Sequence, residues 1–138
     1  MTDPDLTVAS VLADDLREWL LSTLRFPVLS VIAEDGSPSQ SVMWFDIDPD
    51  EPDTILMNTK RGRAKERWLR RDPRVSLCFE EGMRWAALKG RVTLDDDGAR
   101  GMQVIEALAH RYGADPARYQ GQERVTIRLH VEKVVRHD

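Results

Sequence analysis

Residues 54–76 read TILMNTKRGRAKERWLRRDPRVS, and three predicted elements follow one another within them. The apolar run at 54–59 predicts a strand. A basic helix is predicted from about Gly62 to Arg71, and Asp72-Pro73 ends it because a proline disfavours helical geometry in the residue before it. Residues 74–80 then alternate between polar and apolar, as a half-buried strand does. A strand, a basic helix and another strand are therefore the centre of the predicted fold.

The basic helix concentrates the positive charge of an otherwise acidic chain. Residues 60–71 hold seven basic residues and one acidic residue, a net charge of +6, whereas the whole chain carries −4 and the remainder therefore −10. One cationic segment in an acidic protein favours a specific anionic partner over general affinity for nucleic acid. A solvated helix decorated with Arg and Lys remains the alternative interpretation.

The junction between this strand and this helix, residues 58–65, combines two features that attract an anion. The first turn of a helix leaves backbone amides without acceptors and carries about half a positive charge. Cations are unfavourable at that end unless an anion such as a phosphate binds there. Gly62 would let the backbone approach such a ligand closely. The predicted anion-binding residues are Asn58, Thr59, Lys60, Arg61, Arg63 and Lys65.

Outside the junction, apolar or alternating runs bounded by turn residues predict further strands at 28–33, 39–47, 85–94 and 125–131. Gly90 is predicted to mark a bend or bulge within its strand. Apolar stripes at helical spacing predict helices over 7–24 and from about 98 to 112. Six mostly consecutive strands with peripheral helices predict a mainly β (α+β) fold, built as an antiparallel barrel and not as a doubly wound sheet.

The size and composition of the chain set its class. Its 138 residues predict a single domain over residues 1–138. The longest run without a charged residue, Gly36–Phe45, is ten residues, whereas a membrane span needs about 18 or more. The acidic start of the chain does not resemble a secretory signal, and Cys78 has no second cysteine to pair with. A cytoplasmic protein without membrane association is predicted.

Common catalytic and metal-binding motifs are missing from the sequence. It contains no dinucleotide-binding GxGxxG, no P-loop and no GxSxG elbow. The three histidines lack paired ligand spacing, so no metal site is predicted. The acidic turn that begins at Asp46 resembles a calcium loop only superficially, because Glu51 replaces the required glycine and Met57 the bidentate glutamate.

Segments on either side of the junction are similar to one protein family. The segment GSPSQSVMWF at 36–45 resembles the second strand of the pyridoxamine-phosphate-oxidase-like split β-barrel flavoproteins. MNT at 57–59, GRAKER at 62–67 and LRRDPRVS at 69–76 are similar to the cofactor-phosphate helix and next strand of that superfamily. The likeness extends from about Phe26 to Val135 and is most specific from Thr59 to Val75. Within the superfamily, the chain looks most like the branch of deazaflavin oxidoreductases that use coenzyme F420.

This resemblance implies a six-stranded antiparallel split β-barrel of the FMN-binding type and a homodimer with the cofactor at the subunit interface. Four junction residues match phosphate-binding positions: Asn58, Thr59, Arg63 and Lys65. Lys60 and Arg61 suit the anionic tail of the cofactor. Gln40, Ser41 and Val42 match the strand that runs beside the cofactor ring. The chain has four tryptophans, and either some of them close the dimer groove or all four belong to the core: Trp19, Trp44, Trp68 and Trp85.

The implied cofactor is coenzyme F420, with FMN as the alternative. FMN needs a site for one phosphate, whereas the deazaflavin adds a tail with several carboxylates, which the surplus of cations between 60 and 67 suits better. Arginine also outnumbers lysine sixteen to four, a bias typical of the GC-rich genomes in which deazaflavin users are common. Pyridoxamine-phosphate oxidases themselves carry Arg and Lys along the second strand, and residues 40–45 have neither, which argues against that reaction. Trp68 stands where close relatives often have asparagine.

The resulting hypothesis is an oxidoreductase that transfers a hydride between the deazaflavin and a small, electron-poor organic substrate. Tetrapyrroles, quinones and activated alkenes are candidates at the level of the family. No side chain is predicted as an obligate general acid, so no catalytic residue is named. Two alternatives stay open: a flavin- or deazaflavin-binding module without turnover, and a nucleic-acid binder that uses the basic helix. We expect no nucleic-acid partner, since the acidic remainder of the chain would be repelled by a duplex.

Overall fold

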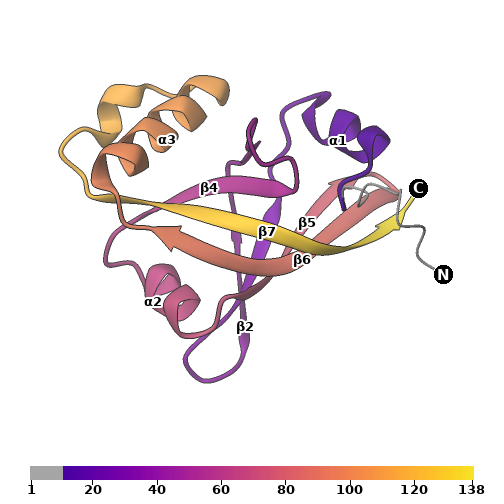
Figure 1. Ribbon diagram of the computed structural model, residues 1–138, viewed down its shortest axis with the longest axis horizontal. Helices are drawn as coiled ribbons and strands as arrows, with labels where there is room; N and C mark the ends of the chain where they lie inside the picture. The colour runs from indigo at the N-terminus through magenta and orange to yellow at the C-terminus, as the bar shows by residue number, and fades with distance from the viewer. Residues whose placement is uncertain (1–10) are drawn as a thin grey trace, which may run out of the picture.

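The computed structural model describes residues 11–138, and the sheet that dominates it is antiparallel throughout. The predicted mainly β fold with peripheral helices is confirmed (Figure 1). The predicted helix over 7–24 is shorter, and its residues 7–10 lie outside the described range. The elements are α1 (Asp14–Leu21), β1 (Val28–Ile32), β2 (Pro38–Val42), β3 (Asp46–Ile47), β4 (Thr54–Lys60), α2 (Ala64–Arg71), β5 (Arg74–Glu81), β6 (Arg84–Asp95), α3 (Gly98–Arg111), the 3-10 helix η1 (Pro116–Tyr119) and β7 (Arg124–His137).

The prediction of a six-stranded barrel is wrong in two respects. Residues 11–138 form seven strands, and they make an open sheet in the order β2-β1-β5-β6-β7-β4-β3. The extra strand arises because the single strand predicted over 39–47 is interrupted at residues 43–45. Its first part, β2, pairs with β1, whereas its last part, β3, pairs with β4. One predicted strand therefore supplies both edges of the sheet.

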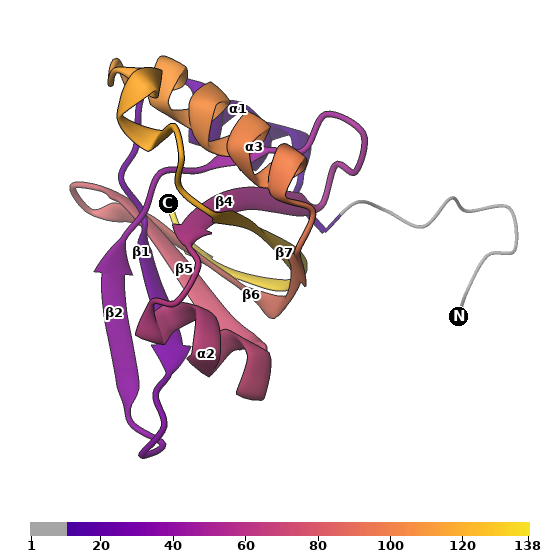
Figure 2. The same ribbon diagram turned by 90° about the vertical axis from the view of Figure 1, so that its left-hand side faces the viewer.

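Two backbone amides mark where the chain leaves the first edge of the sheet and turns toward α3. The Met43 amide donates to the Pro27 carbonyl oxygen at 2.9 Å, and the Phe45 amide donates to the Tyr112 hydroxyl of α3 at 3.3 Å. Phe45 is fully buried and packs edge-on against Phe79 with ring centroids 4.8 Å apart. The chain thus crosses from one sheet edge to the other within a few residues, a reach of about 14 Å at most from Val42 to Asp46. The sheet is curled although it is not closed (Figure 2).

The longest pairing in the sheet joins β6 and β7. The register shifts between Lys89 and Gly90, which confirms the predicted bulge. A Cβ at Gly90 would overlap the His130 carbonyl, so the close approach of the two strands requires glycine there. β7 extends to residue 137, six residues beyond the predicted end at 131, because β6 offers it a partner along that whole length.

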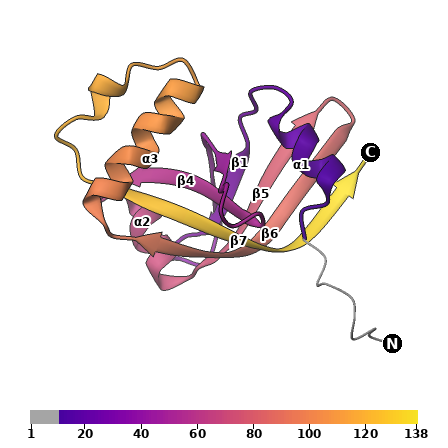
Figure 3. The same cartoon turned by 45° about the horizontal axis from the view of Figure 1, so that its top comes forward.

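The three α-helices cover different parts of the sheet. α3 packs on β4 and β7, α2 packs on β1 and β4, and α1 lies at the opposite end of the sheet from α3 (Figure 3). No helix of the described chain is both long and apolar enough to cross a lipid bilayer. The largest fully buried side chains are Phe45, Phe79, Leu12, Leu16, Leu20, Leu29, Ile55, Met57, Leu69, Leu77, Leu88 and Ile127.

Candidate functional site

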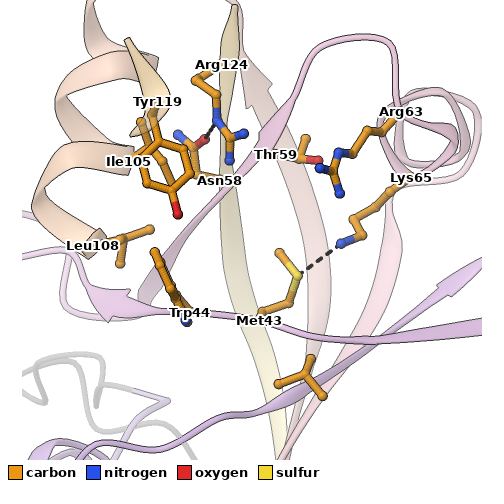
Figure 4. Close-up of a pocket in the computed structure, with 11 residues that line it drawn as sticks. Met43, Trp44, Asn58, Thr59, Arg63, Lys65, Ile105, Leu108, Tyr119 and Arg124 are labelled. Atoms are coloured by element: carbon orange, nitrogen blue, oxygen red, sulfur yellow. Dashed lines mark hydrogen bonds between the residues drawn. The ribbon is translucent and has the colours of Figure 1, made fainter. Parts of the chain in front are cut away.

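A cavity of about 250 Å³ lies where the end of β4, the start of α2 and the segment that joins the two sheet edges meet α3 and η1 (Figure 4). Its position follows from the topology, because Val42 at the end of β2 and Met43 and Trp44 of the segment that joins the two sheet edges form one wall. Arg63 and Lys65 lie on one side of it, whereas Arg124 lies across from them beside the aromatic and aliphatic side chains of the other wall. The lining residues are Val42, Met43, Trp44, Asn58, Thr59, Arg63, Lys65, Ile105, Leu108, Tyr119 and Arg124.

The start of α2 is shaped by a glycine and a glutamate. Gly62 has φ +92°, a left-handed conformation that favours glycine, and it turns the chain from β4 into the helix. Glu66 is buried and accepts hydrogen bonds from the Gly62 amide at 2.7 Å and from Arg70 Nε at 2.8 Å. These bonds, first the one from the Gly62 amide, hold the pKa of Glu66 below its usual value against the opposing effect of burial. The first turn of α2 is thereby fixed beside the cavity.

Two cations of this first turn face the cavity. Arg63 is the N-cap residue of α2, and its side chain makes no hydrogen bond or ion pair with any residue in the range 11–138. Among residues 11–138, the one acceptor of Lys65 Nζ is the Met43 sulfur at 3.1 Å, which is a weak acceptor. Burial, together with the nearby charges of Arg63 and Arg124, lowers the pKa of Lys65. An anion in the cavity would relieve this repulsion.

The third cation comes from the far end of the sequence. Arg124 begins β7, and its register partner on β4 is Lys60. It is 8% exposed, and its Nε donates to Asn58 Oδ1 at 2.9 Å. Burial and the charge of Arg63 lower the pKa of Arg124. None of the described residues that line the cavity is acidic, so three positive charges share it without a carboxylate.

The apolar side of the cavity is aromatic and aliphatic. Trp44 stacks on Tyr112 with ring centroids 5.2 Å apart and meets Tyr119 edge-on at 6.3 Å. Ile105 and Leu108, one turn apart on α3, complete this wall. Figure 4 shows the Tyr119 hydroxyl directed toward Trp44 and Leu108, on the side away from Arg63 and Lys65. The arrangement suits a ligand with an anionic end and a flat, apolar body.

Five of the nine residues predicted to bind a cofactor line this one cavity: Val42, Asn58, Thr59, Arg63 and Lys65. Two others lie on the same edge strand, β2, without lining it. Gln40 donates to the Ser30 hydroxyl at 3.1 Å, and the Ser41 hydroxyl is directed to the Met43 sulfur at 3.7 Å. The structure therefore brings the strand to the site but only its last residue into the cavity.

The remaining two predicted residues, Lys60 and Arg61, do not line the cavity either. Lys60 is exposed at the end of β4. Arg61 is surrounded by carboxylates, with Asp96 at 3.1 Å, Glu123 at 3.3 Å and Glu66 at 3.7 Å. Its charge is therefore already balanced by other parts of the chain.

Six lining residues escaped the sequence analysis as site residues: Met43, Trp44, Ile105, Leu108, Tyr119 and Arg124. Ile105 and Leu108 belong to an apolar stripe of the kind that every core-facing helix has, so the stripe does not distinguish a cavity wall from the core. Arg124 reaches the site only through the pairing of β7 with β4, which leaves no local signal in the sequence. Trp85 is 37% exposed, so the interpretation that all four tryptophans belong to the core is wrong.

Comparisons with known proteins agree with this architecture. A family model described as pyridoxamine 5'-phosphate oxidase matches residues 12–138. A conserved hypothetical protein from Mycobacterium tuberculosis is 24% identical with a TM-score of 0.76, over 96% of this chain and 88% of that one. A structure described as an F420 reductase is 23% identical with a TM-score of 0.67, over 86% and 94%. General Stress Protein 26 from Bacillus anthracis is 17% identical with a TM-score of 0.66, over 88% and 92%. At these identities the structural likeness concerns the fold.

Proposed function

Because the chain belongs to the pyridoxamine 5'-phosphate oxidase family, we propose that it is an oxidoreductase that binds a flavin-type cofactor, with coenzyme F420 as the first candidate. The observation that carries this proposal is the cavity with three cations, no carboxylate and an aromatic wall. A phosphate is the anion that such a cluster at a helix N-terminus suits best. The reaction would transfer a hydride between the cofactor and a small, electron-poor organic substrate.

The residues of the cavity fit such a cofactor by their chemistry. Arg63 and Lys65 would hold the phosphate together with the first amides of α2, which have no acceptor within the helix. Val42 and Trp44 would flank the ring, and the bound cofactor would supply the hydride chemistry. The apolar wall of α3 would exclude water from the reacting face. The protein's part in catalysis would thus be binding, orientation and desolvation.

Two observations support F420 as the first candidate. One structural neighbour is described as an F420 reductase, although at 23% identity the likeness itself extends to the fold alone. Residues 40–45 also lack the arginine and lysine that pyridoxamine-phosphate oxidases carry along this strand. The strand beside the cavity therefore offers a neutral surface to a ring.

FMN is a second candidate, and one observation favours it. A surplus of cations between 60 and 67, among them Arg61, would suit the carboxylate tail of F420 only if these side chains were free. Arg61 is balanced by three carboxylates, and Arg67 donates to the Gly62 carbonyl at 2.8 Å, so neither is free for a tail of carboxylates. The cations that face the cavity suffice for one phosphate, which is what FMN requires. A module that binds either cofactor without turnover uses the same residues.

The experiment is a titration of the purified protein with F420 and with FMN, followed by fluorescence. We expect one of them to bind, and Arg63→Ala and Lys65→Ala to weaken that binding at least tenfold, since each removes a charge-assisted contact of about 1.5–3 kcal/mol. Arg74→Ala is the matched control, because Arg74 pairs with Asp72 at 2.7 Å and does not line the cavity. Binding of neither cofactor would end the proposal.

Turnover is tested separately from binding. The protein loaded with the reduced cofactor is mixed in a single turnover with tetrapyrroles, quinones and activated alkenes, and cofactor oxidation is followed by absorbance. Oxidation faster than that of the free cofactor supports the enzyme. If no substrate class accelerates oxidation although the cofactor binds tightly, the binding module without turnover is the better description.

A further inference from the structure

Arg124 combines deep burial with the lack of a carboxylate partner. Arg61 and Arg70 pair with carboxylates, whereas Arg124 has no acidic partner within the described chain. It is nonetheless more than nine-tenths buried. A buried charge without an opposite charge is costly, so the folded protein keeps a guanidinium whose charge a bound anion would balance.

The direction of this guanidinium is fixed by its neighbours. Nε donates to Asn58 Oδ1 at 2.9 Å and Nη1 donates to Gln122 Oε1 at 3.1 Å. The Tyr119 ring covers one face, with its centroid 5.3 Å from the guanidinium carbon. Nη2 donates to no acceptor within residues 11–138. Figure 4 shows this end of the guanidinium directed toward the cavity. This end is therefore available to a ligand.

Asn58 is occupied on both sides of its amide. Its oxygen accepts from Arg124, and its Nδ2 donates to the Gly101 carbonyl oxygen of α3 at 2.9 Å. The side chain is 7% exposed. Because its oxygen bonds Arg124 and one Nδ2 hydrogen bonds α3, Asn58 holds Arg124 and α3 in place, a role in addition to the direct phosphate contact that its sequence position implies.

The three cations converge from two directions. Figure 4 shows Arg124 on one side of Thr59 and the pair Arg63 and Lys65 on the other. Their charges act on one another, since both arginines lower the pKa of Lys65. A planar carboxylate presents its two oxygens toward one side, whereas the oxygens of a tetrahedral phosphate diverge and can meet donors from both sides.

We propose that Arg124 is a further phosphate-binding residue, which closes a two-sided clamp with Arg63 and Lys65, and that Asn58 is the positioning residue that aims it. The inference rests on the proposed function, because it concerns the phosphate of the same cofactor. The inference holds for either candidate, since F420 and FMN both carry a phosphate.

The test compares cofactors with and without phosphate: FMN against riboflavin, and F420 against its chromophore without the phosphate and tail. Arg124→Gln is expected to weaken binding of the phosphorylated form about tenfold or more and to leave the other form unchanged. Arg124→Lys keeps the charge but loses the fork that contacts Asn58 and the ligand at once, so it should bind with intermediate affinity. Arg74→Gln again serves as the control outside the cavity.

Asn58→Ala supplies a readout of positioning. It should weaken binding of the phosphorylated form alone, and it should add little in the double variant with Arg124→Gln, because both changes remove the same contact. Thermal unfolding of each variant checks its fold. If Arg124→Gln does not fold, Arg124→Lys replaces it in the test. A reduced preference of Arg124→Lys for the phosphorylated form then supports the clamp, and an unchanged preference contradicts it.

The outcomes separate the two proposals. If the wild type binds neither cofactor, or binds it without a preference for the phosphorylated form, the proposed function fails at this site. If the wild type prefers the phosphorylated form and the Arg124 variants keep that preference, the clamp is wrong while the proposed function stands. An equal loss of both forms in the variants would also overturn the clamp, because it would show a merely structural role.

Discussion

Arg61 and Arg63 stand two positions apart and carry the same charge, yet they have different surroundings. Arg61 lies among Glu66, Asp96 and Glu123, whereas Arg63 faces the cavity without a carboxylate. Gly62 separates them, and its φ of +92° turns the chain between the two side chains. At the level of single residues, local backbone conformation therefore decides which cations of the basic segment are available to a ligand.

Lys65 leads to a prediction about pH. Its pKa is lowered by burial and by two nearby arginines, so the side chain loses its charge at a lower pH than an ordinary lysine. Attraction for the phosphate is complete while Lys65 is protonated and declines as the pH rises through this lowered pKa. As the pH rises from neutrality, we expect cofactor affinity of the wild type to fall before the ordinary lysine pKa of about 10.4 is reached, and to fall less in Lys65→Arg, which stays protonated. Fluorescence titrations across this range measure the difference, and identical pH profiles would contradict the assignment.

The helix α3 shows how one element positions part of the site. It packs directly on β7 through Gly101, where a Cβ would overlap the Arg124 carbonyl. The Gly101 carbonyl also accepts the hydrogen bond from Asn58, so the same helical residue contacts both strands. This close approach places Ile105 and Leu108 at the cavity. A helix held farther from the sheet would open the apolar wall.

Gly101→Ala is therefore expected to destabilise the protein by about 1–3 kcal/mol, the usual cost of overpacking a tight contact. Gly98→Ala is the matched control in the first turn of the same helix, where an added Cβ meets no atom within 4 Å. It should be neutral or stabilising by up to about 1 kcal/mol, because alanine favours helix. Urea unfolding of both variants measures the free energies. Equal stability of the two variants would show that α3 tolerates displacement.

On the scale of the whole molecule, the two edges of the sheet are joined by one short segment. Residues 43–45 leave β2 and enter β3, and the cavity lies beside this crossing. Two apolar side chains remain exposed beside it: Val42, which directly precedes the segment, is 63% exposed, and Phe26, which contacts Tyr112 edge-on, is 58% exposed. We propose that a second copy of the chain covers this region, in keeping with the homodimer expected from the sequence.

A dimer has two measurable consequences. Sedimentation should give about twice the 15.8 kDa mass of the chain. If the partner completes the cofactor site, affinity for the cofactor should fall when the protein is diluted below the dissociation concentration of the dimer. Titrations at a series of protein concentrations test this point. A monomer that binds the cofactor as tightly as the dimer would show that one chain contains the whole site.

The basic segment, the strands around it and the family likeness could be read from the sequence because each rests on neighbouring residues. Asp72-Pro73 ends α2 and Gly90 marks a bulge, and both signals act within a few residues of themselves. The break within the strand predicted over 39–47 could not be read, since it depends on a hydrogen bond from Phe45 to Tyr112, 67 positions away. The assignment of Arg61 to the cofactor tail did not anticipate its ion pairs with Asp96 and Glu123.

The sequence by itself determined the antiparallel β architecture, the basic helix start and the cations Arg63 and Lys65, because periodicity, turn residues and local charge act over short distances. Only the tertiary structure decided that the sheet is open with seven strands, that Arg61 is balanced and that Arg124 joins the cavity. Strand pairing brings together residues such as Asn58 and Arg124 that lie 66 positions apart. The hydrogen bond between them forms only in the folded chain, so no local sequence pattern predicts it.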